Sequence, residues 1–488
     1  MNLPWISAER GISVTFPVPP LGDAAVKVLL VSPCQDVTRR TPGALRIPEL
    51  ALQVLAALTD ERHSVRIVVE EWEDLDLSLE PDLVGVSVMT ANARRGYMIA
   101  DHFRNKGAKV VIGGIHASVL ASEAGGHADA VVVGEGEPVW PEVVADAAAG
   151  RLRPLYRSEE PADLSRIPHP RRDLGAVKRF MNLNPLMTTR GCPYDCEFCS
   201  VSRVYGRSIR TFPIAWVVED VRLSGRKYHL ILDDNVIGRP DYARELFKAL
   251  KPLNIRWVGQ CSLSLANRED LLRAAYESGC RGLFVGVETV SEASMRGMKK
   301  CFRDRRDVAD AIARIQGAGI RFHASVVFGF ETDEPEVFDE TFDFLMTCRV
   351  HSATFNILTP YPGTAVYDRL KRQGRLFTED WSYYDHTTVV FRPARMTPRQ
   401  LAEGQRRIRL RFYRLRSILK RFPHHFRRPL FFMAINLAMR FAARRSGLPL
   451  APGSERCGTL RSADREAEPT GKRGARAAWG IQGHAARQ

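Results

Sequence analysis

The chain has 488 residues, of which 45% are hydrophobic and 26% charged, the composition of a globular protein with two or three domains. Its formal net charge is +15, but residues 391–488 alone hold 23 Lys and Arg against 5 Asp and Glu. Residues 1–390 carry a small net negative charge. The basic character therefore belongs to the C-terminal fifth of the chain and not to its main body.

The nine cysteines are odd in number and scattered through a long chain, which is not the pattern of a disulfide framework. We therefore expect a reducing compartment and a cytoplasmic location. The first residues lack a basic segment followed by an apolar core, so no signal peptide is predicted. No run of about 18 apolar residues occurs, so no transmembrane span is predicted either.

The first part of the chain alternates short apolar runs with helical patterns. Strands are predicted at 26–33, 63–71, 81–90, 108–118 and 128–137, with helices at 47–61 and 94–107. This alternation indicates an α/β domain with a doubly wound, flavodoxin-like (Rossmann-like) parallel sheet over residues 25–149. Ligands of such sheets bind at the carboxyl ends of the strands, which here read "SPCQD", "SVMTAN", "GGIHAS" and "GEGE".

A second alternation occupies residues 186–392. An N-terminal arm (1–24) precedes the first domain, and residues 150–185, rich in Arg and Pro, are predicted to be a linker. The strands of the second part are predicted at 186–189, 228–234, 255–262, 282–289, 321–330 and 352–360. Six βα repeats form either a second open sheet or a full or partial TIM-type barrel, and chemistry then belongs at the carboxyl ends of the strands.

Basic helices are predicted over residues 393–448. The stretch 397–422 has the pattern of one long basic helix, and 428–445 is a short apolar segment with arginines at both ends. That segment is too short to span a membrane, but it could lie in a membrane surface with its arginines near anionic lipid. The alternative is a helix that closes the end of the barrel. Residues 449–488 lack periodicity and are predicted to be a disordered tail.

Three cysteines are crowded into the loop after the first strand of the second part. Cys192, Cys196 and Cys199 have the spacing C-x3-C-x2-C. A zinc site normally adds a second pair of ligands, and no such pair is near. Buried structural cysteines do not suit a polar loop that reads "RGCPYDCEFC". Three thiolates can instead hold three irons of a [4Fe–4S] cluster and leave the fourth iron open for a ligand.

This loop resembles the signature of the radical S-adenosyl-L-methionine (SAM) enzymes, C-x3-C-x-aromatic-C, with Phe198 as the aromatic residue. The resemblance covers residues 185–390 and implies a partial (β/α)6 barrel. It also implies that the open iron binds SAM, that an electron from a donor such as flavodoxin or ferredoxin cleaves it, and that the resulting 5′-deoxyadenosyl radical abstracts hydrogen from the substrate. Asp233, Asp234 and Asn235 in "ILDDN" are the candidates to hold the methionine end of SAM. A helix N-cap is the alternative role for them.

Other strand ends of the second part supply further candidate residues for the binding pocket. By the same resemblance, Glu288 in "FVGVET" is expected beside SAM. The ends of the last two strands are expected to line the pocket through Gly329, Glu331, Tyr361, Pro362 and Gly363. His323 lies within a strand, where a structural role is expected. Cys261, Cys280, Cys301 and Cys348 have no partner spacing and are interpreted as ordinary cysteines.

The first domain resembles the cobalamin-binding domain that precedes the barrel in class B radical SAM enzymes. Ser87-Val88-Met89 stands for the S-x-L motif of that family, and Gly113-Gly114 for its Gly-Gly. The resemblance makes Ser87, Thr90, Gly113, Gly114 and His116 the candidates for contact with cobalamin. The histidine of the older D-x-H-x-x-G motif, which ligates cobalt from below, is missing after the first strand, as is common in class B enzymes.

These resemblances imply a cobalamin-dependent radical SAM methyltransferase acting on an unactivated carbon of a small-molecule or lipid substrate. Ring closure or rearrangement on the same cofactors is an alternative. A nucleic-acid-modifying methylthiotransferase is disfavoured, because that family has three cysteines in its N-terminal domain and this chain has only Cys34 before Cys192. A non-catalytic iron–sulfur or cobalamin carrier is disfavoured by the six βα repeats.

Overall fold

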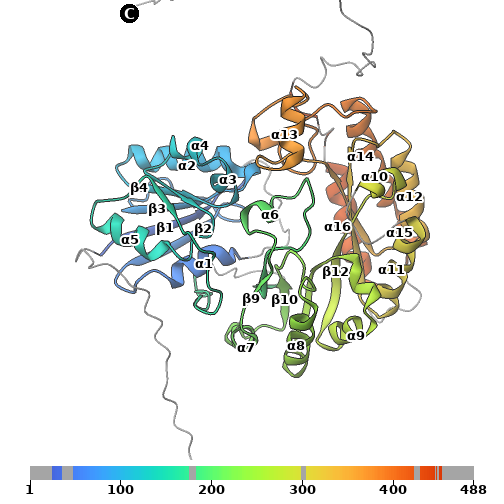
Figure 1. The fold of residues 1–488 in the computed structure, drawn as a ribbon, viewed down its shortest axis with the longest axis horizontal. Helices are drawn as coiled ribbons and strands as arrows, with labels where there is room; N and C mark the ends of the chain where they lie inside the picture. The colour runs from blue at the N-terminus through green and yellow to red at the C-terminus, as the bar shows by residue number, and fades with distance from the viewer. Residues whose placement is uncertain are drawn as a thin grey trace, which may run out of the picture.

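The computed structural model describes residues 25–35, 48–174, 183–297, 304–422, 429–445, 447 and 450–452. The predicted N-terminal arm, and the predicted tail apart from 450–452, lie outside these residues. Figure 1 shows two α/β units side by side, with the C-terminal helices lying against the second unit.

Six parallel strands form the first sheet, in the order β2-β1-β3-β4-β5-β6. Their bounds are β1 Lys27–Ser32, β2 Ser64–Val69, β3 Leu83–Ser87, β4 Lys109–Gly113, β5 Ala130–Val133 and β6 Leu155–Arg157. The order runs outwards from β1 in both directions, so successive connections place helices on opposite faces. One face packs against α1 (Leu50–Ala57) and α5 (Trp140–Ala148), and the other against α2 (Ala93–Asn105), α3 (Ile115–Val119) and α4 (Ala121–Gly125) (Figure 1). The prediction of a doubly wound first domain is confirmed.

Strand β6 lies in the segment that was predicted to be a linker. Only its central residue, Tyr156, is buried, and the Tyr156 hydroxyl donates to Asp146 Oδ2 of α5 at 2.8 Å. A three-residue edge strand with one inward side chain leaves almost no apolar pattern in the sequence. The first sheet therefore extends beyond residue 149, and the linker prediction does not hold for these residues.

The second sheet has the order β14-β13-β12-β11-β10-β7, and every neighbouring pair is parallel. The bounds are β7 Asn184–Leu186, β10 Tyr228–Ile231, β11 Arg256–Cys261, β12 Cys280–Glu288, β13 Arg321–Phe328 and β14 Ser352–Ile357. Each strand pairs with the next in the chain, and within the described residues β14 and β7 do not pair with each other. The sequence left open an open sheet, a full barrel and a partial barrel. The observed order is that of a partial barrel.

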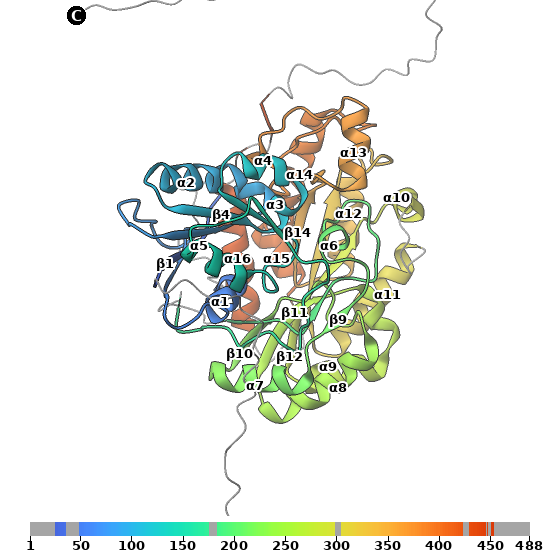
Figure 2. The same cartoon turned by 60° about the vertical axis from the view of Figure 1, so that its left-hand side comes forward.

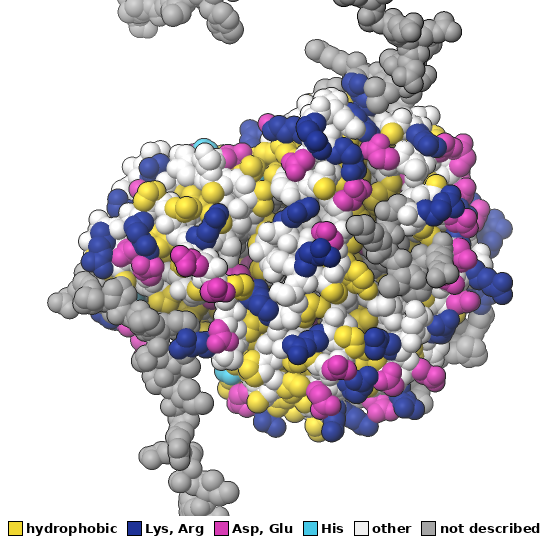
Figure 3. All heavy atoms as spheres, viewed as in Figure 1, with side chains coloured by type: hydrophobic (Ala, Val, Ile, Leu, Met, Phe, Trp, Pro, Cys, Tyr) yellow, Lys and Arg dark blue, Asp and Glu magenta, His cyan; other side chains and the backbone are white. Residues whose placement is uncertain are grey.

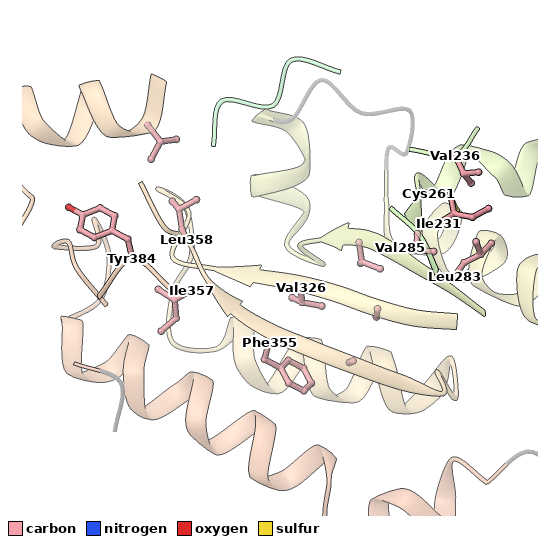
Figure 4. Close-up of a cluster of buried hydrophobic side chains, with 14 of the residues drawn as sticks. Ile231, Val236, Cys261, Leu283, Val285, Val326, Phe355, Ile357, Leu358 and Tyr384 are labelled. Carbon is pink, nitrogen blue, oxygen red and sulfur yellow. The ribbon is translucent and has the colours of Figure 1, made fainter. Parts of the chain in front are cut away.

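The helices of the second unit cover the convex side of its sheet in both cartoon views (Figures 1 and 2). They are α7 Ile214–Ser224, α8 Pro240–Leu250, α9 Glu269–Glu277, α11 Arg305–Gly317 and α12 Val337–Thr347. Alternate strand residues point towards them and are buried, among them Val285, Val326 and Phe355 (Figure 4). The residues between them point to the concave side, and these positions are available for a ligand.

The first strand of the second unit ends earlier than predicted. β7 stops at Leu186, and the chain then enters a short antiparallel ribbon of β8 (Thr189–Arg190) and β9 (Arg210–Thr211). The ribbon forms because Thr188, between β7 and β8, is buried and held by hydrogen bonds from its backbone N–H and its hydroxyl to Asp233. Residues 191–209, which include the three cysteines, are thus a loop closed at its base.

The predicted long basic helix is broken in two. α14 (Pro398–Phe412) begins with a capping box of Thr397 and Gln400, and α15 (Leu415–Lys420) follows after a turn. At the end of α14 the Tyr413 hydroxyl donates to the Ala353 carbonyl of β14 at 2.6 Å. α16 (Pro429–Arg445) completes the C-terminal part. None of the helices in the described residues is long and apolar enough to cross a membrane.

Candidate functional site

The two units meet through loops that follow the carboxyl ends of their strands. Glu135, just after β5, accepts hydrogen bonds from Arg190 at 2.7 Å and from Arg210 at 2.8 and 2.9 Å. At the other end of the interface the Trp381 indole N–H donates to Glu123 at 2.8 Å. The ligand-binding edges of the two sheets therefore adjoin the same interface.

The cysteine loop rises from the β8–β9 ribbon. Gly191 has a φ of +90°, and a Cβ there would lie 2.4 Å from the Ser208 carbonyl oxygen, so only glycine lets the two ends of the loop close. Cys192, Cys196 and Cys199 are partly buried, and in the described part of the chain none of them forms a disulfide. The Cys199 N–H donates to the Cys196 carbonyl at 3.0 Å, which closes a tight turn between these two cysteines.

The three thiols lie close enough to influence one another. Burial raises the pKa of Cys199 to about 11, and Cys196, Asp234 and Cys192 add to the rise. Within the described residues no set of three or more His, Cys, Asp or Glu side chains is arranged around a single metal ion. A [4Fe–4S] cluster does not need such an arrangement, because each thiolate binds a different iron. The donor set of this loop therefore fits a cluster with one open iron.

The three residues after β10 have different environments. Asp233 is buried, and its carboxylate accepts hydrogen bonds from Thr188 and from the Thr189 hydroxyl, the latter at 2.9 Å. It therefore positions the base of the cysteine loop. Asn235 is buried, and its Oδ1 accepts from the Ser262 N–H at 3.2 Å. The charge of Asp234 contributes to the raised pKa of Cys199, and burial together with Asp233 raises the pKa of Asp234 itself to about 6. Asp233 and Asn235 thus make structural hydrogen bonds, whereas Asp234 acts electrostatically on the cysteine loop.

Glu288 ends β12 in an uncommon backbone conformation. Its φ is +64°, and the register of β12 against β13 shifts between Gly286 and Glu288. A left-handed conformation of a residue other than glycine is costly and is concentrated at functional sites. The bulge turns the Glu288 carboxylate away from the regular alternation of the strand. Phe198 packs edge-on against Phe330, with ring centroids 5.9 Å apart, and so anchors the cysteine loop to the end of β13.

The concave side of the barrel has an aromatic floor. Phe284 is 38% exposed although it lies on a central strand, and its ring stacks on His323 with centroids 4.7 Å apart. His323 Nδ1 lies 2.8 Å from the Ser352 hydroxyl, and burial lowers the pKa of His323 to about 4. His323, expected to be only structural, thus lies on the concave side as a neutral side chain.

Constrained residues also follow the last two strands. Glu331 forms an ion pair with Arg375 at 2.9 Å, and Gly329 has a φ of +104° at its turn. The Tyr361 hydroxyl lies 2.9 Å from His386 Nε2, and His386 has a φ of +63°. This Tyr361–His386 pair is a second constrained feature at the same edge as Glu288. The sequence pattern gave no sign of the histidine, which lies 25 residues from its partner in the chain.

Gly363 and Pro362 were also predicted to line the pocket. Pro362 is buried. A Cβ at Gly363 would lie 2.7 Å from Val119 Cγ1 of the first unit, and the φ of Gly363 is +79°. Gly363 therefore lies where the two units are in contact.

The loops of the first unit divide into buried and open positions. His116 is buried, with its Nδ1 3.2 Å from the Thr90 hydroxyl and its ring edge-on to Trp381, so these two candidates lie within the interface. Gly114 has a φ of +102°, and a Cβ there would lie 2.5 Å from the Val88 carbonyl oxygen. A glycine is therefore required at position 114 by the turn of the chain, whether or not a cofactor is in contact with it.

Four positions at the same edge are accessible. Ser87 and Gly113 are partly exposed at the ends of their strands, and a Cβ at Gly134 would meet no atom within 4 Å. Met89 is 61% exposed, although methionine is usually buried. The exposed Met89 side chain and the open glycine backbone leave room for a large planar cofactor such as cobalamin. Cys34, by contrast, is buried, with its Sγ 3.7 Å from Glu70 Oε2.

Sequence reasoning missed the ion network at the interface. Arg190 contacts Glu135 and Glu137, and the three side chains are only 6 to 12% exposed. "GEGE" was placed at the strand edge correctly, but its partner is the arginine that precedes the cysteine loop, 55 residues away from Glu135. The one sign of this network in the sequence was a charged residue, Arg190, directly before "GC".

Comparison with known proteins agrees with these two units. The family described as the Radical SAM superfamily matches residues 186–345, and the B12 binding domain matches residues 44–144. The bacteriochlorophyllide d C-12(1)-methyltransferase of Chlorobaculum tepidum is 30% identical over 81% of this chain and 89% of its own length. The hopanoid C-2 methylase of Rhodopseudomonas palustris is 26% identical over 68% of this chain and 66% of its own.

The fold has a counterpart among solved structures. The radical SAM methyltransferase TsrM from Kitasatospora setae, solved with cobalamin and a [4Fe–4S] cluster bound, has a TM-score of 0.60 at 21% identity, over 72% of this chain and 78% of its own. The predicted cofactors, a [4Fe–4S] cluster, SAM and cobalamin, are confirmed by the two family matches together with these relatives. The chain belongs to the radical SAM enzymes with an N-terminal cobalamin-binding domain, and within them to the methyltransferases.

Proposed function

We propose that this methyltransferase acts on a large, flat and mostly apolar molecule, of the tetrapyrrole class. The observation that carries the proposal is the aromatic floor of the barrel, where Phe284 stacks on the neutral His323 yet stays 38% exposed. A planar ring system gains both apolar burial and stacking on such a surface. The C. tepidum relative is named for a bacteriochlorophyllide and supports the same class, whereas the R. palustris relative is named for a lipid.

Roles follow for the residues at the strand ends. Cys192, Cys196 and Cys199 are proposed as the cluster ligands, with Phe198 as their support. When bound, the cluster and SAM supply a radical that removes hydrogen from an unreactive C–H bond, and cobalamin supplies the methyl group.

The acidic side chains would orient SAM. Asp234 is partly buried next to Cys199, where a carboxylate can accept hydrogen bonds from an amino group. Glu288 faces the same edge from β12. Asp233 and Asn235 act through the loops that they hold and not by direct contact.

Ser87, Met89 and Gly113 are proposed to contact cobalamin. Their accessible positions at the carboxyl ends of β3 and β4 leave room for its planar face. Thr90, Gly114 and His116 instead keep the loops of this edge in place against the barrel.

Labelled-methyl SAM tests the reaction. The reconstituted enzyme is incubated with a bacteriochlorophyllide or with a hopanoid, and the products are analysed by mass spectrometry. We expect a labelled tetrapyrrole product. A converted product without label would indicate ring closure or rearrangement, and a labelled hopanoid alone would replace the tetrapyrrole proposal by a lipid one.

Phe284→Ala tests the aromatic floor. We expect weaker substrate binding and loss of methylated product, while SAM is still cleaved to 5′-deoxyadenosine. Tyr276→Ala is the matched control, because Tyr276 is equally exposed, at 39%, but lies on the outer helix α9. Equal effects of the two substitutions would refute a substrate role for Phe284.

We also propose two partners. Arg203 and Arg207 are exposed within the cysteine loop, and their charge suits an acidic electron donor such as flavodoxin or ferredoxin. Arg203→Gln with Arg207→Gln should slow reduction of the cluster by flavodoxin at low salt, but leave reduction by dithionite unchanged. The second partner is a membrane surface, contacted peripherally by the basic C-terminal helices.

A further inference from the structure

The outward face of α16 is apolar and uncovered in the described structure. Leu430, Leu437 and Phe441 are 83, 43 and 58% exposed and follow one another at helical spacing. Phe432 and Asn436 lie on the opposite face and are buried. A helix on the surface of a soluble protein normally has polar residues on its outward side. α16 differs, because its outward side is apolar as well. Contiguous exposed apolar surface of this kind marks an interaction site.

A basic pocket opens beside that face. It has a volume of about 400 Å³, which falls within the range of ligand sites, and it lies between α14, α15 and α16. Its lining consists of Leu410, Tyr413, Arg414, Leu415, Arg440, Ala443 and Arg444. Arg440 Nη1 donates to the Tyr413 carbonyl at 3.1 Å, which holds this guanidinium at the pocket. The pocket thus combines three cations with apolar walls.

The positive charge around the pocket is compensated only in part, by the ion pairs of Arg407 and Arg411 with Asp339. Residues 404–454 contain 13 Lys and Arg and no Asp or Glu. In the described part of the chain, no ion pair with an acidic side chain is formed by Arg414, Arg440 or Arg444. On the face shown in Figure 3, by contrast, basic and acidic side chains are interspersed. The pocket is therefore suited to an anion from outside the chain.

The surface is held rigidly by a buried arginine. Arg421 is 1% exposed and donates to the Val350 carbonyl at 2.9 Å and to Asn436 Oδ1 of α16 at 3.1 Å. Its guanidinium also lies 3.7 Å from the centroid of the Phe412 ring. These contacts tie α14, α15 and α16 to the amino end of β14. The pocket and the apolar face are consequently formed before any ligand arrives.

We infer that the pocket binds the phosphate headgroup of an anionic phospholipid while the outward face of α16 enters the acyl boundary of the bilayer. The inference rests on the peripheral membrane contact proposed above and identifies its site. An anionic lipid matches both parts of the surface, since its phosphate pairs with arginine and its chains cover Leu430, Leu437 and Phe441.

Other occupants match less well. The chain after residue 452 carries 7 Lys and Arg against 4 Asp and Glu, so it is itself basic. A second copy of this face would bring the same charge. Because the surface adjoins the amino end of β14, docking would leave the carboxyl ends of the strands, where the reaction takes place, free of the membrane.

Vesicle co-sedimentation of the full chain tests the inference. Vesicles of phosphatidylcholine are compared with vesicles that also contain phosphatidylglycerol, and we expect binding only to the anionic ones, weakening with salt. Arg440→Gln with Arg444→Gln should lower the partition coefficient about twenty-five-fold, because each arginine near an anionic surface contributes about fivefold. Arg226→Gln with Arg273→Gln removes the same charge from the distant barrel surface and should change it less than twofold.

The outcomes separate the pocket from the membrane contact. Absence of binding to any vesicle would overturn both. Binding that survives the pocket substitutions, or equal binding to neutral vesicles, would overturn the headgroup site alone. Inorganic phosphate that displaces the protein from vesicles at millimolar concentration, independently of ionic strength, would indicate a free-anion site instead. Leu437→Ser with Phe441→Ser should also abolish binding, and thermal unfolding with cobalamin uptake verifies that each variant is folded.

Discussion

Glu135 is the acidic residue on which the docking of the two units depends, and we predict that Glu135→Ala loosens their interface. Its carboxylate accepts hydrogen bonds from Arg190, Arg210 and the Ala162 N–H, the last at 2.7 Å. The Glu135 side chain is 6% exposed, and those of Arg190 and Arg210 are 10 and 19% exposed. Removal of the carboxylate leaves two partly buried guanidinium groups without this partner.

The expected cost follows from this burial. Breaking a buried ion pair by removing one partner costs about 3–5 kcal/mol, and the remaining exposure of Arg210 places this case near 3 kcal/mol. Arg190 keeps its contact with Glu137, which also favours the lower figure. A loss of about 3 kcal/mol raises the population of the undocked state by about two orders of magnitude.

Amide hydrogen exchange of the cysteine loop is the assay, because Arg190 lies at the base of that loop. We expect exchange in residues 191–209 to accelerate about a hundredfold, together with a broadened electron paramagnetic resonance signal of the reduced cluster. Glu160→Ala is the control, since Glu160 is exposed in the chain segment next to Ala162. Unchanged exchange in Glu135→Ala, or equal acceleration in Glu160→Ala, would refute the reasoning.

Three other predictions concern the cluster, a turn and two histidines. Cys192→Ala should abolish formation of 5′-deoxyadenosine while cobalamin uptake, followed by absorbance, stays intact. Gly114→Ala should sharply reduce cobalamin uptake, because its Cβ would lie 2.5 Å from a carbonyl oxygen, whereas Gly107→Ala has a similar φ but open space and should retain uptake. Burial lowers the pKa of His323 and of His351 to about 4, so their contribution to stability is present above pH 6.5 and is lost as the pH falls towards 4. Urea unfolding at pH 7 and pH 5 should differ by about 2 kcal/mol for each of the two histidines, and replacing both by Gln should remove the difference.

The sequence was sufficient for the arrangement of the strands because parallel strands buried on both faces are written as continuous apolar runs. "VKVLLVSP" and "DAVVVGEGE" are of this kind, and both are strands of the first sheet. β6 was missed because only Tyr156 of its three residues points inwards. The break after α14 was missed because the basic pattern continues through it, and the residue at the break, Tyr413, is held by a tertiary contact with β14 that no local pattern shows.

The candidate site shows the same limit at the level of single residues. Asp233 and Asp234 are adjacent and chemically identical, yet one is used inside the protein by Thr188 while the other stands beside Cys199. No local pattern separates them, because the difference depends on which side of the strand end faces the cysteine loop. His116 is a similar case. Its position in "GGIHAS" suggested a cofactor contact, and only the position of Trp381 shows that the His116 ring is covered.

Arg190 connects the cysteine loop to the carboxyl edge of the first sheet. It directly precedes Gly191 and Cys192, so its position fixes the base of the loop that is proposed to hold the cluster. Its guanidinium is fixed in turn by Glu135 and Glu137 at the carboxyl edge of the other sheet. A radical formed at one edge is useful only if the methyl donor at the other edge lies within reach of the same carbon. The buried network sets that separation directly, and so the spacing of the two reactive centres does not depend on the length of chain between the two units.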